Sequence, residues 1–326
     1  MEKYQHFTGT VNTLRVRQRL DQVLVQLLHD CSRTQIKAWI LDGLVKVNGR
    51  IITLPKEKIF GGETVEVCVI VKKVLRWEPQ AIRLNIIYED DHILVINKAS
   101  DFVVHPGAGH ENGTVLNALL DYFPPIAEVP RVGIVHRLDK DTTGLMVVAK
   151  TVLAQNRLSR SLQAREITRE YEAVAIGHMI SGGTVDKPIA RHPIQRTHMM
   201  IHPTGKPSVT HYRVMEHFRA HTRLRLRLQS GRTHQIRVHM AHINHPLVGD
   251  PIYKKRPRLI KGASASFNEA LYHFNRQALH ATLLKLCHPI TTINMEWRVP
   301  LPQDMVALIA ALKADTEMLK IHMNCL

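Results

Sequence analysis

The sequence is poor in cysteine and in metal-site motifs. Its 326 residues include four cysteines, and no two of them form a CxxC pair. Such scattered cysteines exclude a disulfide framework and the usual zinc-site spacing. Four histidines cluster at His234, His239, His242 and His245, but no HExxH motif accompanies them. We therefore expect no bound metal.

Long apolar runs are also missing. No run approaches the roughly 20 residues that a membrane-spanning helix needs. Residues 1–20 contain no apolar core of the kind that signal peptides carry. We therefore expect no membrane association and a cytoplasmic location. Hydrophobic residues still make up 44% of the chain, which is enough to bury a substantial core.

Acidic residues are scarce relative to basic ones. The chain has 28 aspartates and glutamates against 44 lysines and arginines, a formal net charge of +16. A surplus of this size favours a polyanion as partner, and without membrane signals that partner is a nucleic acid. The sequence shows neither a GxxxxGK[ST] phosphate loop nor a GxGxxG motif after a strand, so we expect no nucleotide cofactor.

The N-terminal part has the pattern of a small helix-and-sheet unit. Apolar residues recur at helical spacing over residues 20–28 and again before Gly43, which predicts two short helices. The Asn48-Gly49 dipeptide between strand-like arms predicts a β-hairpin. Alternating valines over residues 65–71 predict a further strand.

This region resembles an S4 RNA-binding domain. The resembling stretch is RLDQVLVQLLHDCSRTQIKAWILDGLVKVNG, and the match covers roughly residues 14–75. The resemblance makes Arg19, Arg33 and Lys37 candidates for contacting RNA. The alternative is that these cations form an ordinary solvated face, although several on two consecutive short helices favour a binding surface.

The composition changes after this unit. We expect an S4-like domain over residues 1–75, a polar linker over 76–84, and a second domain over 85–326. The second region is rich in strands, with helices between them and no regular βαβ alternation. This pattern predicts an α+β fold with a mixed, mainly antiparallel sheet.

The most informative stretch is GIVHRLDKDTTGLMVVAK, residues 133–150. Apolar residues flank a polar turn, so Asp139 is expected between two strands. Asp139 and Asp141 could be ordinary turn carboxylates. They could also begin a calcium loop, but the twelfth position, where such a loop needs glutamate, is Lys150. A catalytic carboxylate is the third interpretation.

Three motifs in order resemble the RluA family of pseudouridine synthases. HRLDKDTTGLMVVAK resembles the motif that holds the family's nucleophilic aspartate, which implies that role for Asp139. REITREYEA resembles the second motif and implies that Tyr171 stands beside the target base. LQSGRTHQIRVH resembles the third motif and implies that Arg237 pairs with the aspartate. Ser230 and Thr143 depart from the family's usual threonine and serine, and neither change removes a reacting group.

The resemblance implies isomerisation, in which the C–N glycosidic bond is broken, the uracil turns, and the link is remade through carbon. An aspartate can serve as the nucleophile, and a neighbouring arginine keeps it charged and can orient it through a bidentate pair. Tyr171 could stack on the base or exchange a proton with it. The residues leave open which role matters and whether Asp139 attacks the sugar or the base.

Further cations are candidates for binding the RNA. Reaching a paired uridine requires flipping it from the stack, and Arg137 could fill the vacated space or neutralise backbone charge. Arg232 and His234, from the third motif, are expected to contact RNA. A basic run in a predicted loop could contact phosphates or be merely solvated; it comprises Lys254, Lys255 and Arg256.

The resemblance extends over nearly the whole chain. It implies uridines of 23S ribosomal RNA in the hairpin at the intersubunit bridge, hence the large ribosomal subunit as partner, and we expect a monomer. A non-catalytic RNA-binding ribosome assembly factor would explain the charge and the first 75 residues, but not the three motifs together. A metal-dependent hydrolase lacks ligands at a sensible spacing.

Overall fold

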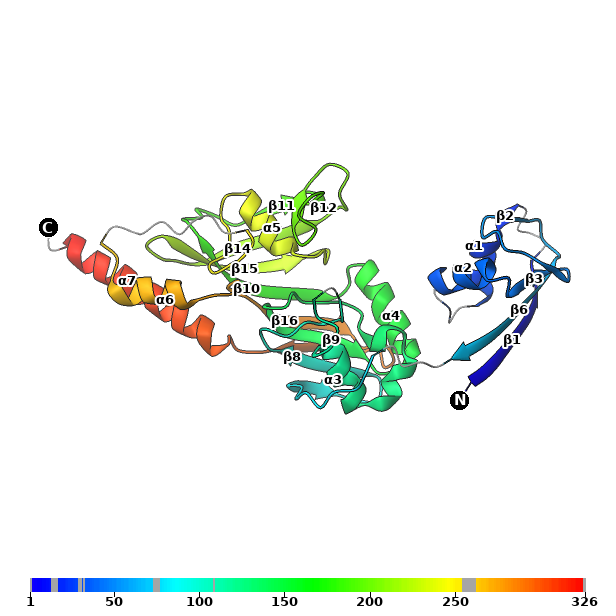
Figure 1. Ribbon diagram of the computed structural model, residues 1–326. Helices are drawn as coiled ribbons and strands as arrows, with labels where there is room; N and C mark the ends of the chain where they lie inside the picture. Colours follow the sequence, from blue (N-terminus) through cyan, green and yellow to red (C-terminus); the bar gives the residue numbers. More distant parts are fainter. Residues whose placement is uncertain are drawn as a thin grey trace. The chain divides into compact units, whose positions relative to one another are not determined.

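The computed structural model divides into two compact units, Met1–Arg76 and Trp77–Leu326, which are described separately below (Figure 1). The residues that the structure describes are 2–12, 17–28, 31, 33–72, 77–107, 109–253 and 262–324.

Unit 1 combines two short helices with a four-stranded sheet. The helices are α1 (Leu20–Leu27) and α2 (Arg33–Leu41). The sheet has the order β1-β6-β3-β4, built from β1 (Glu2–Thr10), β6 (Thr64–Lys72), β3 (Val45–Val47) and β4 (Arg50–Ile51). A separate pair joins β2 (Gln18–Arg19) to β5 (Lys58–Ile59).

The core of unit 1 confirms the apolar spacing expected from its sequence. Leu20 and Leu24 of α1 are fully buried, as are Ile36 and Ile40 of α2. They pack with the inward valines of β3 and β6. The predicted hairpin is also confirmed, because Asn48 and Gly49 both have positive φ, at 50° and 78°, between β3 and β4. Asparagine and glycine suit that conformation, which matches the twist of a two-residue hairpin.

Unit 2 is built on a nine-stranded sheet with the order β11-β14-β15-β10-β16-β9-β8-β7, and β17 pairs with β16. The strands β16 and β9 run parallel, and the other pairings within this sheet are antiparallel. The α+β fold with a mixed, mainly antiparallel sheet is thus confirmed. The strand bounds are β7 (Ile86–Glu89), β8 (Ile93–Lys98), β9 (Thr143–Ala149), β10 (Thr168–Ile176), β11 (Gly183–Asp186), β14 (Val209–His217), β15 (His221–Leu228), β16 (Leu279–Cys287) and β17 (Asn294–Arg298).

Helices surround this sheet (Figure 1). They are α3 (Val115–Tyr122), α4 (Val152–Gln163), α5 (Gln235–His242), α6 (Ala265–His273) and α7 (Gln303–Asn324), with 3-10 turns η1 (Pro124–Glu128) and η2 (Pro130–Gly133). A short hairpin of β12 (Ile189–Arg191) and β13 (Met199–Ile201) lies outside the main sheet.

Strand β9 is buried on both faces, and this explains its continuous apolar sequence. Met146 and Val148 pack into a cluster with α3 and the 3-10 turns. Leu145 and Val147 point the other way and pack against α4. The residues just before β9 are thereby anchored on a rigid strand, and these residues include Asp139.

The segment expected as a linker over residues 76–84 is, in its described part, attached to unit 2. Trp77 and Leu84 pack against the apolar cluster that holds α3. The Asn117 side chain donates to the Glu78 carbonyl at 2.8 Å. The apolar side chains within this polar stretch account for the difference, because burying them stabilises the packed arrangement.

Candidate active site

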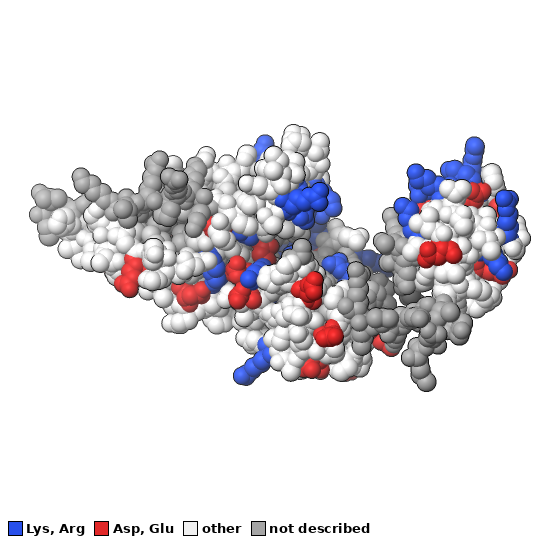
Figure 2. Space-filling model, viewed as in Figure 1, with Lys and Arg blue, Asp and Glu red and all other residues white. Residues whose placement is uncertain are grey.

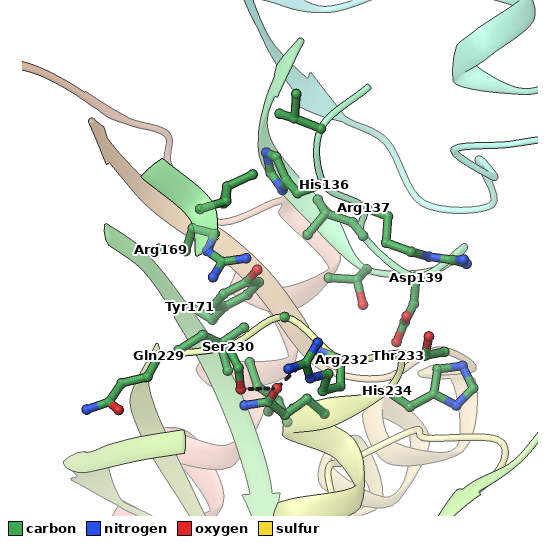
Figure 3. A pocket seen from close by; sticks show the side chains of 18 of the residues that line it. His136, Arg137, Asp139, Arg169, Tyr171, Gln229, Ser230, Arg232, Thr233 and His234 are labelled. Carbon is green, nitrogen blue, oxygen red and sulfur yellow. Dashed lines mark hydrogen bonds between the residues drawn. The ribbon is translucent and has the colours of Figure 1, made fainter. Parts of the chain in front are cut away.

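A cavity of about 580 Å³ in unit 2 collects the three residues that the sequence motifs single out. Figure 3 labels two of them, Asp139 and Tyr171. Asp139 lies in the turn before β9, Tyr171 lies on β10, and Arg237 lies in the first turn of α5. Segments far apart in the chain therefore meet in one pocket. The Thr142 amide donates to the Asp139 carbonyl at 3.1 Å and closes the turn.

Arg237 links two carboxylates. Its Nη1 donates to Asp139 Oδ2 at 3.1 Å, while Nε and Nη2 donate to the two oxygens of Asp250 at 2.7 and 3.0 Å. The Asp139 side chain is 15% exposed, and those of Arg237 and Asp250 are 4% and 0% exposed. The reachable carboxylate is therefore Asp139, whereas Asp250 is an internal support.

The expected pairing of Arg237 with Asp139 is present, but its geometry differs from the expectation. The bidentate pair forms with Asp250, and Asp139 receives a single hydrogen bond. Asp250 also accepts from the amides of Ile252 and Tyr253, at 2.8 and 3.0 Å. Asp250 thus fixes the guanidinium, which leaves one Asp139 oxygen outside this pair for chemistry.

The charges of Arg237 and Asp250 stabilise one another. Burial acts to lower the pKa of Arg237, but the hydrogen bonds and charge of Asp250, with the charge of Asp139, raise it above its usual value. Burial acts to raise the pKa of Asp250, and Arg237 outweighs that effect and lowers it. Both groups therefore stay ionised at neutral pH.

Tyr171 is 4% exposed, and its neighbours in the pocket include Asp139 and Arg169. Burial raises the pKa of the phenol; the charge of Arg169 opposes this shift, and the charge of Asp139 acts in the same direction as burial. The phenol is therefore protonated at neutral pH and can donate a hydrogen bond. The register of β10 against β16 shifts between Glu170 and Tyr171, an irregularity that can re-aim a side chain toward a site.

His234 stands at the start of α5 in a left-handed conformation, with φ of 55°. Its Nδ1 lies 2.8 Å from the Tyr253 hydroxyl, which also accepts from the Met199 amide at 2.8 Å. Burial lowers the pKa of His234. The ring is therefore neutral, with one nitrogen held by the Tyr253 hydroxyl.

The loop of the third motif is held by a side chain that sequence reasoning overlooked. The Gln235 carbonyl oxygen accepts from Ser230 Oγ at 2.8 Å and from the Arg232 amide at 3.0 Å, bonds drawn dashed in Figure 3. Its amide nitrogen donates to the Val209 carbonyl at 3.0 Å. Gln235 therefore fixes the loop that carries Arg232, whose side chain is exposed at the pocket rim.

A buried lysine donates hydrogen bonds to the backbone around the turn that carries Asp139. Lys98 is 2% exposed. Its Nζ donates to the carbonyls of Ala99, Phe102 and Lys140 at 2.7, 2.8 and 2.7 Å. Burial lowers the pKa of Lys98 to about 7, against the opposing charges of nearby aspartates. Sequence reasoning missed this lysine, because a polar residue closing an apolar strand carries no distinctive pattern.

The lining of the pocket is strongly cationic. Asp139 is the acidic residue among its described lining residues. The arginines that line it are Arg131, Arg137, Arg165, Arg169, Arg232 and Arg237. This excess of positive charge suits a ligand that brings several phosphates. Arg137, expected to act in base flipping, is among these residues (Figure 3).

The candidate RNA-binding residues of unit 1 differ in whether their charge is already paired with an acid. Arg19 forms two hydrogen bonds with Asp21, at 2.9 and 2.6 Å, so part of its charge is already matched. Lys37 is exposed. Figure 2 shows lysine and arginine side chains along the margins of the visible face of unit 1, with uncharged and acidic side chains between them. The side chain of Arg33 and the run Lys254–Arg256 lie outside the described residues.

Among the described residues, no group of three or more histidine, cysteine, aspartate or glutamate side chains could hold a metal ion. Within the same ranges, no helix has the length and apolar character needed to cross a membrane.

Comparison with known proteins identifies the class to which this fold and pocket belong. The model of the RNA pseudouridylate synthase family matches residues 92–242, and the S4 domain model matches residues 18–65. The first range contains Asp139, Tyr171 and Arg237. Together with the relatives described next, these matches show that the chain belongs to the RNA pseudouridylate synthase family and is an isomerase with an S4 domain.

Particular relatives are similar over almost the full length. The chain is 65% identical over 317 residues to ribosomal large subunit pseudouridine synthase D of Escherichia coli (strain K12), covering 97% of each chain. It is 64% identical over 324 residues to the protein of that name from Yersinia pestis, covering 99% of this chain and 100% of the relative.

Solved structures agree on the fold. Human RNA pseudouridylate synthase domain containing 1 superposes with a TM-score of 0.52 and 28% identity, over 72% of this chain and 96% of that one. Human RNA pseudouridylate synthase domain containing 4 gives a TM-score of 0.55 at 24% identity, over 70% and 93%. The second likeness concerns the fold alone.

Proposed function

We propose that this enzyme converts specific uridines to pseudouridine in the RNA of the large ribosomal subunit, with Asp139 as nucleophile. The observation that carries the proposal is the Asp139–Arg237 contact of 3.1 Å in an arginine-lined cavity. The printed names of the full-length relatives support the ribosomal substrate. The target lies in the 23S hairpin at the intersubunit bridge.

The pocket residues divide the reaction among them. The uridine flips out of its helix into the cavity, and Arg137 at the pocket wall occupies the space it leaves. The Asp139 carboxylate, oriented by Arg237, attacks the flipped nucleotide, and the bond that it forms breaks again when the product is released. The bond from C1′ to N1 breaks, the bond from C1′ to C5 forms, C5 loses a proton and N1 gains one.

Tyr171 is placed to serve that proton exchange. Its ring lies in the pocket wall, and its phenol is protonated because burial raises the pKa. The atoms of substrate and product are the same, so no redox partner or energy donor is consumed. Neither a metal nor a cofactor takes part in this scheme.

Unit 1 supplies affinity for the RNA in the proposal, and the enzyme acts as a monomer. Its exposed cations suit phosphate contacts, whereas the reacting groups are all in unit 2. A non-catalytic assembly factor would use the same cationic surface. That alternative gives no reason for a carboxylate, an arginine and a second carboxylate to be aligned in a pocket.

Replacing Asp139 with asparagine tests the proposal, because the change removes the charge and keeps the shape. On a 23S hairpin fragment, we expect the purified variant to lose pseudouridine formation by a factor of roughly 10³ or more. Its RNA affinity and melting temperature should stay close to those of the wild type. Appreciable turnover by the variant would remove Asp139 from the mechanism.

A further inference from the structure

The buried arginines of unit 2 differ in whether an acidic side chain pairs with them. Among the described residues, three arginines are less than 9% exposed: Arg169 at 8%, Arg237 at 4% and Arg276 at 8%. Arg237 has its bidentate partner in Asp250, and Arg276 donates to both oxygens of Asp304 at 2.6 and 2.9 Å. Arg169 forms no side-chain hydrogen bond or ion pair with any described residue, and its buried Nε has no acceptor.

Arg169 belongs to the wall of the active-site pocket. It lies two residues before Tyr171 on β10, and both side chains line the cavity (Figure 3). Its guanidinium fills the space above Gly231, where a Cβ atom would come within 2.7 Å of Nη1. The glycine of the third motif therefore makes room for this arginine.

A second donor without an acceptor lines the same pocket. The Nε2 of His136 accepts from the Val147 amide at 3.0 Å, so the proton of the neutral ring is on Nδ1. Burial lowers the pKa of His136 to about 3, with a contribution from the charge of Arg169, and this keeps the ring neutral. The buried Nδ1–H has no acceptor among the described residues.

Unmatched buried groups of this kind are costly. A buried charge normally has a counter-charge, and a buried donor normally has an acceptor. Among the described residues, the buried Nε of Arg169 and the buried Nδ1 of His136 lack an acceptor on this pocket wall, and no acid pairs with Arg169, whereas Arg237 and Arg276 each pair with an aspartate. This contrast indicates that the acceptor arrives with the ligand.

The charge of Arg169 selects among possible acceptors. Uracil carbonyls are neutral and would leave the guanidinium charge unmatched. A phosphodiester offers a negative charge and two oxygens, which suit a guanidinium and a neighbouring N–H donor. A flipped uridine brings one phosphate on each side.

We propose that Arg169, with His136, binds a phosphodiester adjoining the target uridine. The proposal rests on the function proposed above and adds a substrate-binding role for a residue outside the Asp139–Arg237–Asp250 row. Binding of the RNA supplies the missing counter-charge, so the wall of the pocket becomes fully matched only in the complex. The phosphate also anchors the flipped nucleotide beside Tyr171.

A double-substitution experiment tests this contact. RNA hairpins carry one neutral methylphosphonate, either before or after the target uridine, and are bound by wild-type enzyme and by Arg169→Met. We expect Arg169→Met to weaken binding of unmodified RNA by roughly tenfold or more. At one of the two positions, methylphosphonate should weaken wild-type binding similarly, and combining both changes should add little. Losses that multiply at both positions would overturn the proposal.

Matched variants guard against a trivial loss of structure. Arg165→Met removes an exposed pocket arginine that contacts Gln229. At the phosphate position where Arg169→Met and methylphosphonate add little to one another, the losses from Arg165→Met and methylphosphonate should multiply. Arg169→Lys should retain part of the affinity. In thermal unfolding of the free enzymes, Arg169→Met should melt no lower than wild type, whereas Arg276→Met should melt lower. A large drop for Arg169→Met would show that the free protein already matches this charge, and would overturn the proposal.

The two proposals fail in different ways. Wild-type enzyme that binds the hairpin and makes no pseudouridine would contradict the proposed function. If the wild-type enzyme is active but the losses from Arg169→Met and from methylphosphonate multiply at both phosphates, only the role of Arg169 is contradicted. Inorganic phosphate gives an independent readout, since it should raise the melting temperature of wild type more than that of Arg169→Met.

Discussion

The two units handle positive charge in opposite ways. On unit 1, Lys37, Lys46 and Arg50 are exposed on the surface. In unit 2, Arg237 and Arg276 are buried and each is matched to an acid. Exposed charges are screened by salt and act over a distance, whereas buried pairs act through fixed geometry. The exposed charges of unit 1 suit long-range attraction of RNA, whereas the buried pairs of unit 2 fix side chains in place.

The largest effect is expected where a buried pair is broken. Asp250→Asn leaves the Arg237 guanidinium with one carboxylate in place of two, and we expect the unfolding free energy to fall by about 3–5 kcal/mol. Turnover should fall too, because Arg237 no longer holds Asp139 in one orientation. Denaturant unfolding and single-turnover assays measure both quantities.

Asp304→Asn is the matched control for that change. Asp304 also forms a bidentate pair with a buried arginine, but its own side chain is 45% exposed. We expect a smaller loss of stability, since solvent replaces part of the lost interaction. Equal losses in the two variants would show that burial of the acid does not set the difference.

Next in size is the loss of the Tyr171 hydroxyl. Tyr171→Phe keeps the ring and removes the phenol, so stacking survives and proton exchange does not. We expect the single-turnover rate to fall about 100-fold, with RNA affinity close to that of the wild type. A variant that retained the full rate would restrict Tyr171 to stacking against the base.

Neutralising surface charges on unit 1 should have a weaker effect. The double change Lys37→Gln and Lys46→Gln should lower RNA affinity and make its salt dependence shallower. On a logarithmic plot the slope changes by up to about 0.7–0.9 per lost phosphate contact. The rate at saturating RNA should hardly change. If instead the saturated rate drops and the salt slope is kept, unit 1 orients the RNA and does not merely attract it.

Arg19→Gln is the control on the same unit. Arg19 is already bonded to Asp21, so its removal should change the salt slope less than loss of Lys37 does. A larger effect for Arg19 would mean that the ion pair opens when RNA binds.

Chelation should have no effect at all. The proposed reaction uses Asp139, Arg237 and Tyr171 without a metal ion. Enzyme assayed with pre-folded RNA and excess EDTA should keep its single-turnover rate. Activity lost under chelation and restored by zinc or magnesium would contradict the proposed chemistry.

Local patterns in the sequence predicted much of the fold. The helical spacing that buries Leu20 and Ile36 and the Asn48-Gly49 turn follow from short-range preferences. The parallel contact of β9 with β16 does not, because it joins strands more than a hundred residues apart and no local preference encodes it. The packing of Trp77 in unit 2 could not be predicted either, because Trp77 lies in a polar stretch and its packing partners come from later in the chain.

In the candidate site too, some features could be predicted from the sequence and others depend on tertiary contacts. Resemblance of three motifs brought Asp139, Tyr171 and Arg237 together, and the structure shows them lining one pocket. Asp250 went unnoticed although the stretch HPLVGDP places a lone acid after apolar residues. A carboxylate in such a position needs a buried cation as partner, and that requirement was the signal available. The direction of the Lys98 side chain toward three carbonyls depends on tertiary structure alone.

The most direct test of the central claim is a map of pseudouridines in ribosomal RNA from cells that lack this protein. Uridines of the 23S hairpin at the intersubunit bridge should be unmodified in those cells. Wild-type protein should restore the modification, and the Asp139→Asn variant should not. An unchanged map in the deletion strain, or full restoration by Asp139→Asn, would contradict the assignment of this pocket as the site of isomerisation.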